Sequence, residues 1–293
     1  MRSTHYLREN AQVEQNSQLL DLALKVATEA GAFLSERPAN FDIESKSTVI
    51  DIATQMDREA EAMIVAGILN ERGDDGIIAE EGASRPSNSG ITWVIDPLDG
   101  TVNYLYDLPG WCVSVACKDA AGTLVGVVYA PTLNIASSNG ASSDRAEGEA
   151  SFSVTPPGGG AIWSATRGGG ALRNGKSLQV SDESEIERAL IGTGFAYSMD
   201  VRKDQVRVIN DLLPRCRDIR RLGAAAVDLC HVASGTLDAY FEVGLKEWDK
   251  AAGALIITEA GGQVSGGESE DSRLVAANPL LHDRLKAFLA SYA

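Results

Sequence analysis

Apolar residues recur with a helical period close to the amino-terminal end of the chain. Between Leu19 and Leu34 they stand three or four positions apart, and Pro38 follows the last of them. Ser17 precedes the run, and serine is a common N-cap residue. The pattern predicts an amphipathic helix from Ser17. Because the preceding residues are polar, we expect a disordered extension over residues 1–17.

A second helix is predicted from Thr54 to about Asn70. Thr54 and Asp57 have the spacing of a capping box, in which each residue satisfies a backbone N–H group of the other. Asp57 taken by itself is therefore a helix cap, and the functional alternative is a carboxylate directed toward the same point as Asp96. Short apolar runs predict buried strands at Gly76–Ala79, Trp93–Ile95, Cys112–Cys117 and Leu124–Tyr129.

Strand and helix patterns alternate more regularly later in the chain, which predicts a layered α/β arrangement. The expected strands cover 190–195, 218–222, 237–242 and 274–277, and the expected helices cover 205–213, 223–234, 250–260 and the segment from 279. Residues 137–160 are rich in Ser, Gly, Pro and Glu without periodicity, and they predict a flexible insertion. We divide the chain into a first half, 18–165, which contains the insertion, and a second half, 166–293.

One stretch matches the phosphate-loop pattern G-x-x-x-x-G-K-[ST] letter for letter, Gly170–Ser177. A phosphate loop requires a strand before its first glycine and a helix that opens at its lysine. Here Gly168 and Gly169 precede the motif, and the strand-like run Leu178–Val180 follows it. Asn174-Gly175 is a strong hairpin signal. We predict a hairpin and keep a nucleotide hydrolase as the minor alternative.

The charge balance narrows the classes of partner. Lys and Arg number 26 against 41 Asp and Glu, for a net charge of −15. Without a basic footprint, binding to nucleic acid is not expected. A phosphorylated small molecule stays open if cations reverse the local charge. The first seventeen residues contain no apolar run long enough for a signal peptide or membrane span, so we expect a cytoplasmic protein without membrane contact.

Cysteine and histidine offer little chemistry. The four cysteines lie in apolar runs without C-x-x-C spacing, which favours buried free thiols over a metal site. The three histidines, His5, His231 and His282, are read as core or surface residues. Because none of the three histidines is a good candidate for a Ser-His-Asp triad, carboxylates must provide the acid–base groups if the protein is an enzyme.

The most informative stretch is Trp93–Asn103. Its apolar residues lead directly into Asp96, Pro97 is expected to end the strand pairing, and Gly100 loosens the backbone. Asp96 and Asp99 can converge on a hard divalent cation. A hydroxyl group and backbone N–H groups at a helix start stand next to them and suit a phosphate. The stretch predicts an anion held through metal.

Two further acids stand at element boundaries. Glu80 follows the strand Gly76–Ala79, and Asp249 opens the helix that contains Lys250. Each alone reads as a solvated loop acid or an N-cap. If these acids converge with Asp57, Asp96 and Asp99, each pair at ~4 Å repels by about 4 kcal/mol at an effective dielectric constant of ~20. Such a cluster requires compensating cations.

The order and spacing of four blocks resemble the inositol monophosphatase family of lithium-sensitive, magnesium-dependent phosphatases, and its bacterial inositol-1-monophosphatases in particular. The blocks are Lys46-Ser47 with Asp51 and Asp57, Ala79–Gly82, Asp96–Tyr104, and Trp248–Gly253 with Glu259–Gly262. The likeness extends from about Leu19 to the carboxyl terminus. It implies a five-layer α-β-α-β-α fold, a metal site between the two halves, and a homodimer.

The resemblance also implies metal ligands. Glu80, Asp96 and the Leu98 carbonyl would hold a first Mg²⁺, and Asp96, Asp99 and Asp249 would hold a second. The family commonly has Ile where Leu98 stands, and a backbone ligand is unaffected by that change. The cofactor expected is Mg²⁺, two or three ions per site.

Catalytic roles follow from the same resemblance. Glu80 and Thr101 would help a metal-activated water to attack phosphorus in line, without a covalent phosphoenzyme. A third, weaker Mg²⁺ would use Glu80 and waters, with Asp57 nearby. The N–H groups of Gly100 and Thr101 would receive the phosphate.

The implied substrate is a myo-inositol monophosphate. Glu242, Asp99 and the Ala225 N–H group would contact its hydroxyl groups, with Asp249 beside it. Ala224 departs from members that have Ser or Thr there. Histidinol phosphate is the alternative substrate, and relatives that cleave fructose 1,6-bisphosphate or phosphoadenosine phosphate share the metal ligands. A non-catalytic regulatory protein on this fold is the alternative class.

Overall fold

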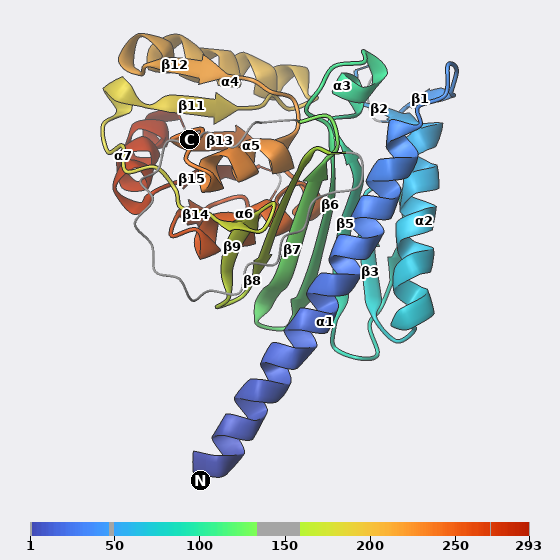
Figure 1. Ribbon diagram of the computed structural model, residues 1–293. Helices are drawn as coiled ribbons and strands as arrows, with labels where there is room; N and C mark the ends of the chain where they lie inside the picture. Colours follow the sequence, from blue (N-terminus) through green and yellow to red (C-terminus); the bar gives the residue numbers. More distant parts are fainter. Residues whose placement is uncertain (1, 47–49, 134–158, 270, 293) are drawn as a thin grey trace.

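The computed structural model describes residues 2–46, 50–133, 159–269 and 271–292, and Figure 1 shows how their helices and strands are arranged. The α-helices within these ranges are α1 (Arg2–Ser35), α2 (Gln55–Glu71), α3 (Thr101–Leu105), α4 (Met199–Leu212), α5 (Ala225–Ala233), α6 (Glu247–Glu259) and α7 (Pro279–Leu289). Short 3₁₀ helices cover Ile186–Arg188, Leu213–Arg215 and Ala290–Tyr292.

The strands of the described residues form three sheets. The small sheet pairs β1 (Ile43–Ser45) with β2 (Ile52–Thr54). The large sheet contains β3 (Gly76–Ala79), β4 (Ser84–Arg85), β5 (Thr92–Asp99), β6 (Cys112–Asp119), β7 (Gly122–Ala130), β8 (Ala161–Thr166), β9 (Gly170–Arg173) and β10 (Lys176–Ser177), in the order β10-β9-β8-β7-β6-β5-β3-β4. The third contains β11 (Leu190–Thr193), β12 (Asp218–Arg220), β13 (Ala239–Val243), β14 (Gln263–Ser265) and β15 (Arg273–Ala277), in the order β12-β11-β13-β15-β14.

The protein has five layers, which are held together by three apolar cores. Leu19, Val26 and Leu34 of α1 pack with Ile64 of α2 against one face of the large sheet. Helices α5 and α6 fill the space between its other face and the third sheet. Residues of α4 and α7 cover the outer face of the third sheet. The order is α-β-α-β-α, as expected, and Figure 1 shows α5 and α6 between the two large sheets.

The amino-terminal prediction was wrong. Helix α1 begins at Arg2, so residues 1–17 do not precede it as a disordered extension and Ser17 is not its N-cap. The segment from Arg2 contains no proline and no glycine before Gly31, and Arg, Glu and Gln favour helix. The change from polar to apolar residues therefore indicates where α1 starts to pack on the sheet and does not indicate where the helix itself begins.

The expected boundary between halves, residue 165/166, falls inside β8. The large sheet continues through β9 and β10 to Ser177, and the third sheet starts at Leu190. The cause is the hairpin predicted at Asn174-Gly175, whose φ angles are 47° and 77° and which returns β10 onto β9. The hairpin is confirmed in place of a phosphate loop. The insertion expected at 137–160 lies, apart from Gly159 and Gly160, outside the described residues.

Candidate active site

A cavity of about 270 Å³ lies where the ends of β5, β11 and β13 meet the starts of α5 and α6. It brings together nearly all residues predicted for the site: Glu80, Asp96, Leu98, Asp99, Gly100, Thr101, Ala225, Glu242 and Asp249. Asp57 is the exception, because it does not line the cavity and lies directly behind Thr101.

Strand β5 delivers Asp96 and Asp99 to this cavity through an irregularity in its pairing. Asp96 is opposite Ser114 and Asp99 is opposite Cys112, and the register shifts between them. Pro97 has no N–H group to pair, but it does not end the strand as predicted. In a regular strand, residues three apart face opposite sides, so the shift is what puts both carboxylates on one side. Gly100, with φ of 90°, then turns the chain into α3.

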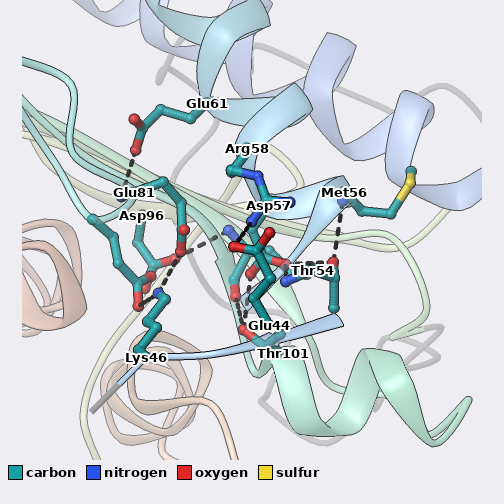
Figure 2. Close-up of polar contacts among 12 residues, drawn as sticks. Glu44, Lys46, Thr54, Met56, Asp57, Arg58, Glu61, Glu81, Asp96 and Thr101 are labelled. Atoms are coloured by element: carbon teal, nitrogen blue, oxygen red, sulfur yellow. Dashed lines mark hydrogen bonds and ion pairs between the residues drawn. The ribbon is translucent and has the colours of Figure 1, made fainter. Parts of the chain in front are cut away.

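Asp57 caps helix α2 and also contacts Thr101, which lines the cavity. Its Oδ2 accepts hydrogen bonds from the Thr54 N–H group (2.8 Å) and the Thr54 hydroxyl group (2.5 Å), which completes the predicted capping box. Its Oδ1 accepts the Thr101 hydroxyl group at 2.9 Å, as Figure 2 shows. The same hydroxyl group lies 3.1 Å from the Leu98 carbonyl oxygen. Burial raises the pKa of Asp57 despite the hydrogen bonds of Thr54.

Glu61 fixes the loop that contains Glu80, and sequence reasoning missed it. The buried Glu61 carboxylate accepts the backbone N–H groups of Glu81 (2.7 Å) and Ala83 (2.9 Å), and Figure 2 shows the contact with Glu81. Glu61 follows Asp57 by one helical turn, so an acid on the buried face of the predicted helix was the available signal.

Lys46 forms ion pairs with the two acidic side chains of this loop. Its ammonium group lies 3.0 Å from Glu80 Oε1 and also contacts Glu81. Burial lowers the pKa of Lys46, but Glu80 and Glu81 outweigh it and the net change is upward. Burial raises the pKa of Glu81 to about 7 although Lys46 opposes the change.

The second half of the chain closes the cavity. Asp249, in the first turn of α6, accepts the Lys246 N–H group at 2.6 Å. The start of α5 holds Asp99, whose Oδ2 accepts the Ala226 N–H group at 2.7 Å. Glu242, near the end of β13, accepts the hydroxyl group of Tyr240. Segments more than 100 residues apart therefore build one site.

The site holds more negative charge than its cations balance. Burial, and then Glu80 and Asp99, raise the pKa of Asp96 well above its usual range. Burial and the neighbouring Asp99 do the same for Asp249. Burial raises the pKa values of Asp99 and Glu242 to about 7. Such clustered carboxyl groups favour an external cation.

The donor set fits Mg²⁺ in kind and place, because carboxylate and carbonyl oxygens are the ligands it prefers. In the present side-chain directions, no three acidic, histidine or cysteine residues of the described ranges form a group that could hold a metal ion. Glu80 is turned to Lys46, Asp99 to Ala226 and Asp249 to Lys246. Metal binding therefore requires at least one of these side chains to change its direction.

His231 and His282, predicted to be core or surface residues, are both buried. His282 is buried and lies 2.9 Å from the Ser265 hydroxyl group, and His231 packs edge-on against Trp163. Cys112, Cys117 and Cys230 are buried free thiols as predicted, whereas Cys216 is a free thiol that is only partly buried. Among the described helices, none combines the length and apolar character needed to cross a bilayer.

The layered fold and its cavity define a mixed α/β protein with an acidic candidate site. The model of the inositol monophosphatase family matches residues 15–292, and the chain belongs to that family, whose members are mostly phosphatases.

Individual relatives agree with this assignment. The Nus factor SuhB of Pasteurella multocida is 38% identical over 271 residues, with 89% of this chain and 91% of the relative covered. Among solved structures, an inositol monophosphatase from Anabaena is 30% identical, with a TM-score of 0.73 and coverage of 94% and 96%. A Thermotoga maritima IMPase is 29% identical, with a TM-score of 0.78 and coverage of 94% and 98%.

Proposed function

We propose that this protein is a Mg²⁺-dependent phosphomonoesterase that hydrolyses myo-inositol monophosphate to myo-inositol and phosphate. The observation that carries the proposal is the convergence of Glu80, Asp96, Asp99 and Asp249 on one cavity. Glu80, Asp96 and the Leu98 carbonyl oxygen would hold one ion, and Asp96, Asp99 and Asp249 a second. When bound, Mg²⁺ supplies Lewis acidity and neutralises the charge that develops on phosphoryl and leaving oxygens.

The attacking water is oriented by the chain's own groups. Thr101 donates its hydroxyl proton to Asp57 Oδ1 at 2.9 Å, so its oxygen is left to accept a hydrogen bond from a water in the cavity. Glu80, on the loop pinned by Glu61, offers a carboxylate oxygen to the same water. Asp57 thus holds Thr101 in one orientation. We place the in-line attack on phosphorus between these residues, without a covalent intermediate.

Phosphate is assigned to the N–H groups of Gly100 and Thr101. Helix α3 is only five residues long, so the N–H groups themselves, rather than a helix dipole, support this assignment. The alcohol is assigned to the wall that contains Glu242, with Asp99 and Ala225 nearby. Glu242 and Asp99 are hydrogen-bond acceptors suited to a polyol. Histidinol phosphate is the alternative substrate, because carboxylates also accept from an ammonium group.

A second candidate role comes from the SuhB relatives, which are named Nus factors. It would involve a partner in a transcription complex and would not need catalysis. The net charge of −15 favours a protein partner over direct contact with nucleic acid. An Asp99→Asn variant that keeps such a partner while losing turnover would show that both roles exist on one chain.

The decisive test of phosphatase activity is phosphate release from myo-inositol 1-phosphate with Mg²⁺ and with EDTA. We expect activity only with Mg²⁺, and inhibition by Li⁺. Asp99→Asn should lower kcat/KM by about 1,000-fold because it weakens cation binding at the centre of the site. Asp119→Asn, which changes an acid outside the cavity, is the control and should retain activity. Hydrolysis that persists in EDTA would refute the proposal. A homodimer in the cytoplasm also remains a prediction.

A further inference from the structure

One wall of the cavity is built from two parallel strands with complementary side-chain sizes. Gly192 of β11 is paired with Tyr240 of β13, and Gly194 lies beside the carboxylate of Glu242. Residues two apart share a face of a strand, so small residues on β11 face large polar ones on β13. A Cβ atom on Gly194 would collide with the Glu242 carboxylate. The glycines therefore create the space that the polar side chains occupy.

Asp228 of α5 enters the same space. A Cβ atom on Gly192 would lie 3.0 Å from Tyr240 Cδ2 and 3.5 Å from Asp228 Oδ1. Asp228 lines the cavity together with Tyr240 and Glu242. Sequence reasoning gave Asp228 no role, because it lies within an apolar helical pattern.

The Asp228 carboxyl group lacks what buried carboxyl groups normally have. The residue is 1% exposed, and within the described part of the chain its Oδ1 has no hydrogen-bond partner. Asp75 is equally buried, at 1%, but it is bonded to Arg72, Ser89 and Trp93. Leaving a buried polar atom unpaired destabilises the folded protein. An acceptor kept at that cost beside a cavity indicates a partner that arrives with a ligand.

We propose that Asp228 is a specificity-determining residue that pairs through Oδ1 with a hydroxyl group of a polyol phosphate ester, next to the hydroxyl group bound by Glu242. This inference rests on the proposed phosphomonoesterase function and deepens it by naming a second contact to the alcohol. At this wall Asp228 and Glu242 present carboxyl groups, which suit the hydroxyl groups of the alcohol better than its phosphoryl group. The ester must therefore enter with its phosphoryl group toward Thr101 and its hydroxyl groups toward β11 and β13.

Protonation is consistent with this arrangement. Burial, and then Glu242 and Asp99, raise the pKa of Asp228 well above its usual range, while Arg221 opposes the change. A protonated Asp228 can donate to a hydroxyl oxygen as well as accept from a hydroxyl group. An amide at this position would retain both abilities.

The test compares two substrates in the full-length protein with saturating Mg²⁺. The ratio of kcat/KM for myo-inositol 1-phosphate to kcat/KM for p-nitrophenyl phosphate, whose leaving group has no hydroxyl group besides the esterified one, isolates recognition of the additional hydroxyl groups. Asp228→Ala should lower this ratio about tenfold, mainly through KM of the inositol ester. Asp228→Asn should stay within about threefold of wild type because it conserves the hydrogen-bonding atoms.

Stability separates recognition from a structural role. Asp228→Ala removes an unpaired buried group, so its thermal midpoint should be no lower than that of the wild type. The matched control, Asp75→Asn, breaks satisfied contacts and should lower the midpoint without changing the substrate ratio. A wild-type preference for the inositol ester that Asp228→Ala leaves unchanged would overturn the Asp228 assignment alone. A wild-type enzyme that hydrolyses only the nitrophenyl ester would overturn the polyol substrate and the Asp228 assignment together.

Discussion

The two ends of the cavity are built by different means. The end assigned to hydrolysis is made of Glu80, Asp96, Asp99 and Thr101, with Asp57 behind Thr101, and hydrogen bonds tie these residues to the surrounding protein. At the alcohol end, made of Gly194, Asp228, Tyr240 and Glu242, space comes from glycines and one buried acceptor is left unpaired. The groups assigned to the chemical step therefore already have hydrogen-bond partners within the protein, whereas Asp228 Oδ1, assigned to substrate choice, has none among the described residues and is left for the substrate to satisfy.

The comparison is tested most strongly at Thr101. Thr101→Val keeps the shape of the side chain but removes the hydroxyl group that Asp57 orients. We expect kcat to fall about 100-fold with little change in KM, because a proton-accepting contact to the attacking water is lost. Steady-state kinetics on myo-inositol 1-phosphate measures both. Thr101→Ser is the control and should recover most of the rate. An equal loss of kcat in the two variants would mean that the side chain acts through packing, and it would contradict a role for the hydroxyl group.

Glu61 tests whether the hydrolytic end depends on its scaffold. Glu61→Gln leaves one of the two N–H groups of Glu81 and Ala83 without its carboxylate acceptor. The loop with Glu80 should then hold Mg²⁺ about tenfold more weakly, as seen when groups that orient metal ligands are changed. Mg²⁺ titration by calorimetry and by activity gives this value. Glu59→Gln, exposed on the same helix, should leave it unchanged, and an equal shift in both would contradict the assignment.

The pH dependence of KM tests the role of Glu242 at the end of the cavity assigned to the alcohol. Its pKa is raised to about 7 by burial, so it gains its charge as pH rises through that value. A carboxylate accepts hydroxyl groups better than a carboxylic acid, and KM for the inositol ester should fall about threefold to tenfold between pH 6 and pH 8. Glu242→Gln should remove this pH dependence and leave kcat on p-nitrophenyl phosphate nearly unchanged.

The same shift gives a smaller effect on stability. A folded-state pKa above the unfolded value means that Glu242 holds its proton more tightly when folded. Its contribution is present below the unfolded pKa and is lost as pH rises toward about 7. The thermal midpoint of the metal-free protein should therefore fall more between pH 5 and pH 8 in the wild type than in Glu242→Gln. A fall of equal size in both would contradict the assignment.

Much of the fold could be predicted, because it follows from local patterns. The helical period after Leu19, the capping box at Thr54 and the hairpin at Asn174-Gly175 all depend on neighbouring residues, and all are present. The start of α1 and the extent of the large sheet were wrong. Neither has a local signal in the sequence. Polar residues that favour helix extend α1 toward the amino terminus, and the sheet to which a strand belongs depends on the strand with which it pairs, which can be distant in sequence.

The site could be predicted only in part. Asp96 and Asp99 could be predicted as cation ligands from the stretch Trp93–Asn103 alone, whereas Asp57, Glu80 and Asp249 each read as caps or loop acids until the family resemblance joined them to that stretch. Glu61 and Asp228 were missed because their roles depend on burial and on partners distant in sequence. For Asp228 the informative feature is a missing hydrogen bond, which only coordinates can reveal.

The most direct measurement of the central claim is kcat/KM across four esters at saturating Mg²⁺, repeated in EDTA. The esters are myo-inositol 1-phosphate, histidinol phosphate, fructose 1,6-bisphosphate and phosphoadenosine phosphate. We predict the highest value for myo-inositol 1-phosphate, the next highest for histidinol phosphate, and no turnover of any ester in EDTA. Hydrolysis of none of the four with Mg²⁺, or equal rates with and without EDTA, would contradict it.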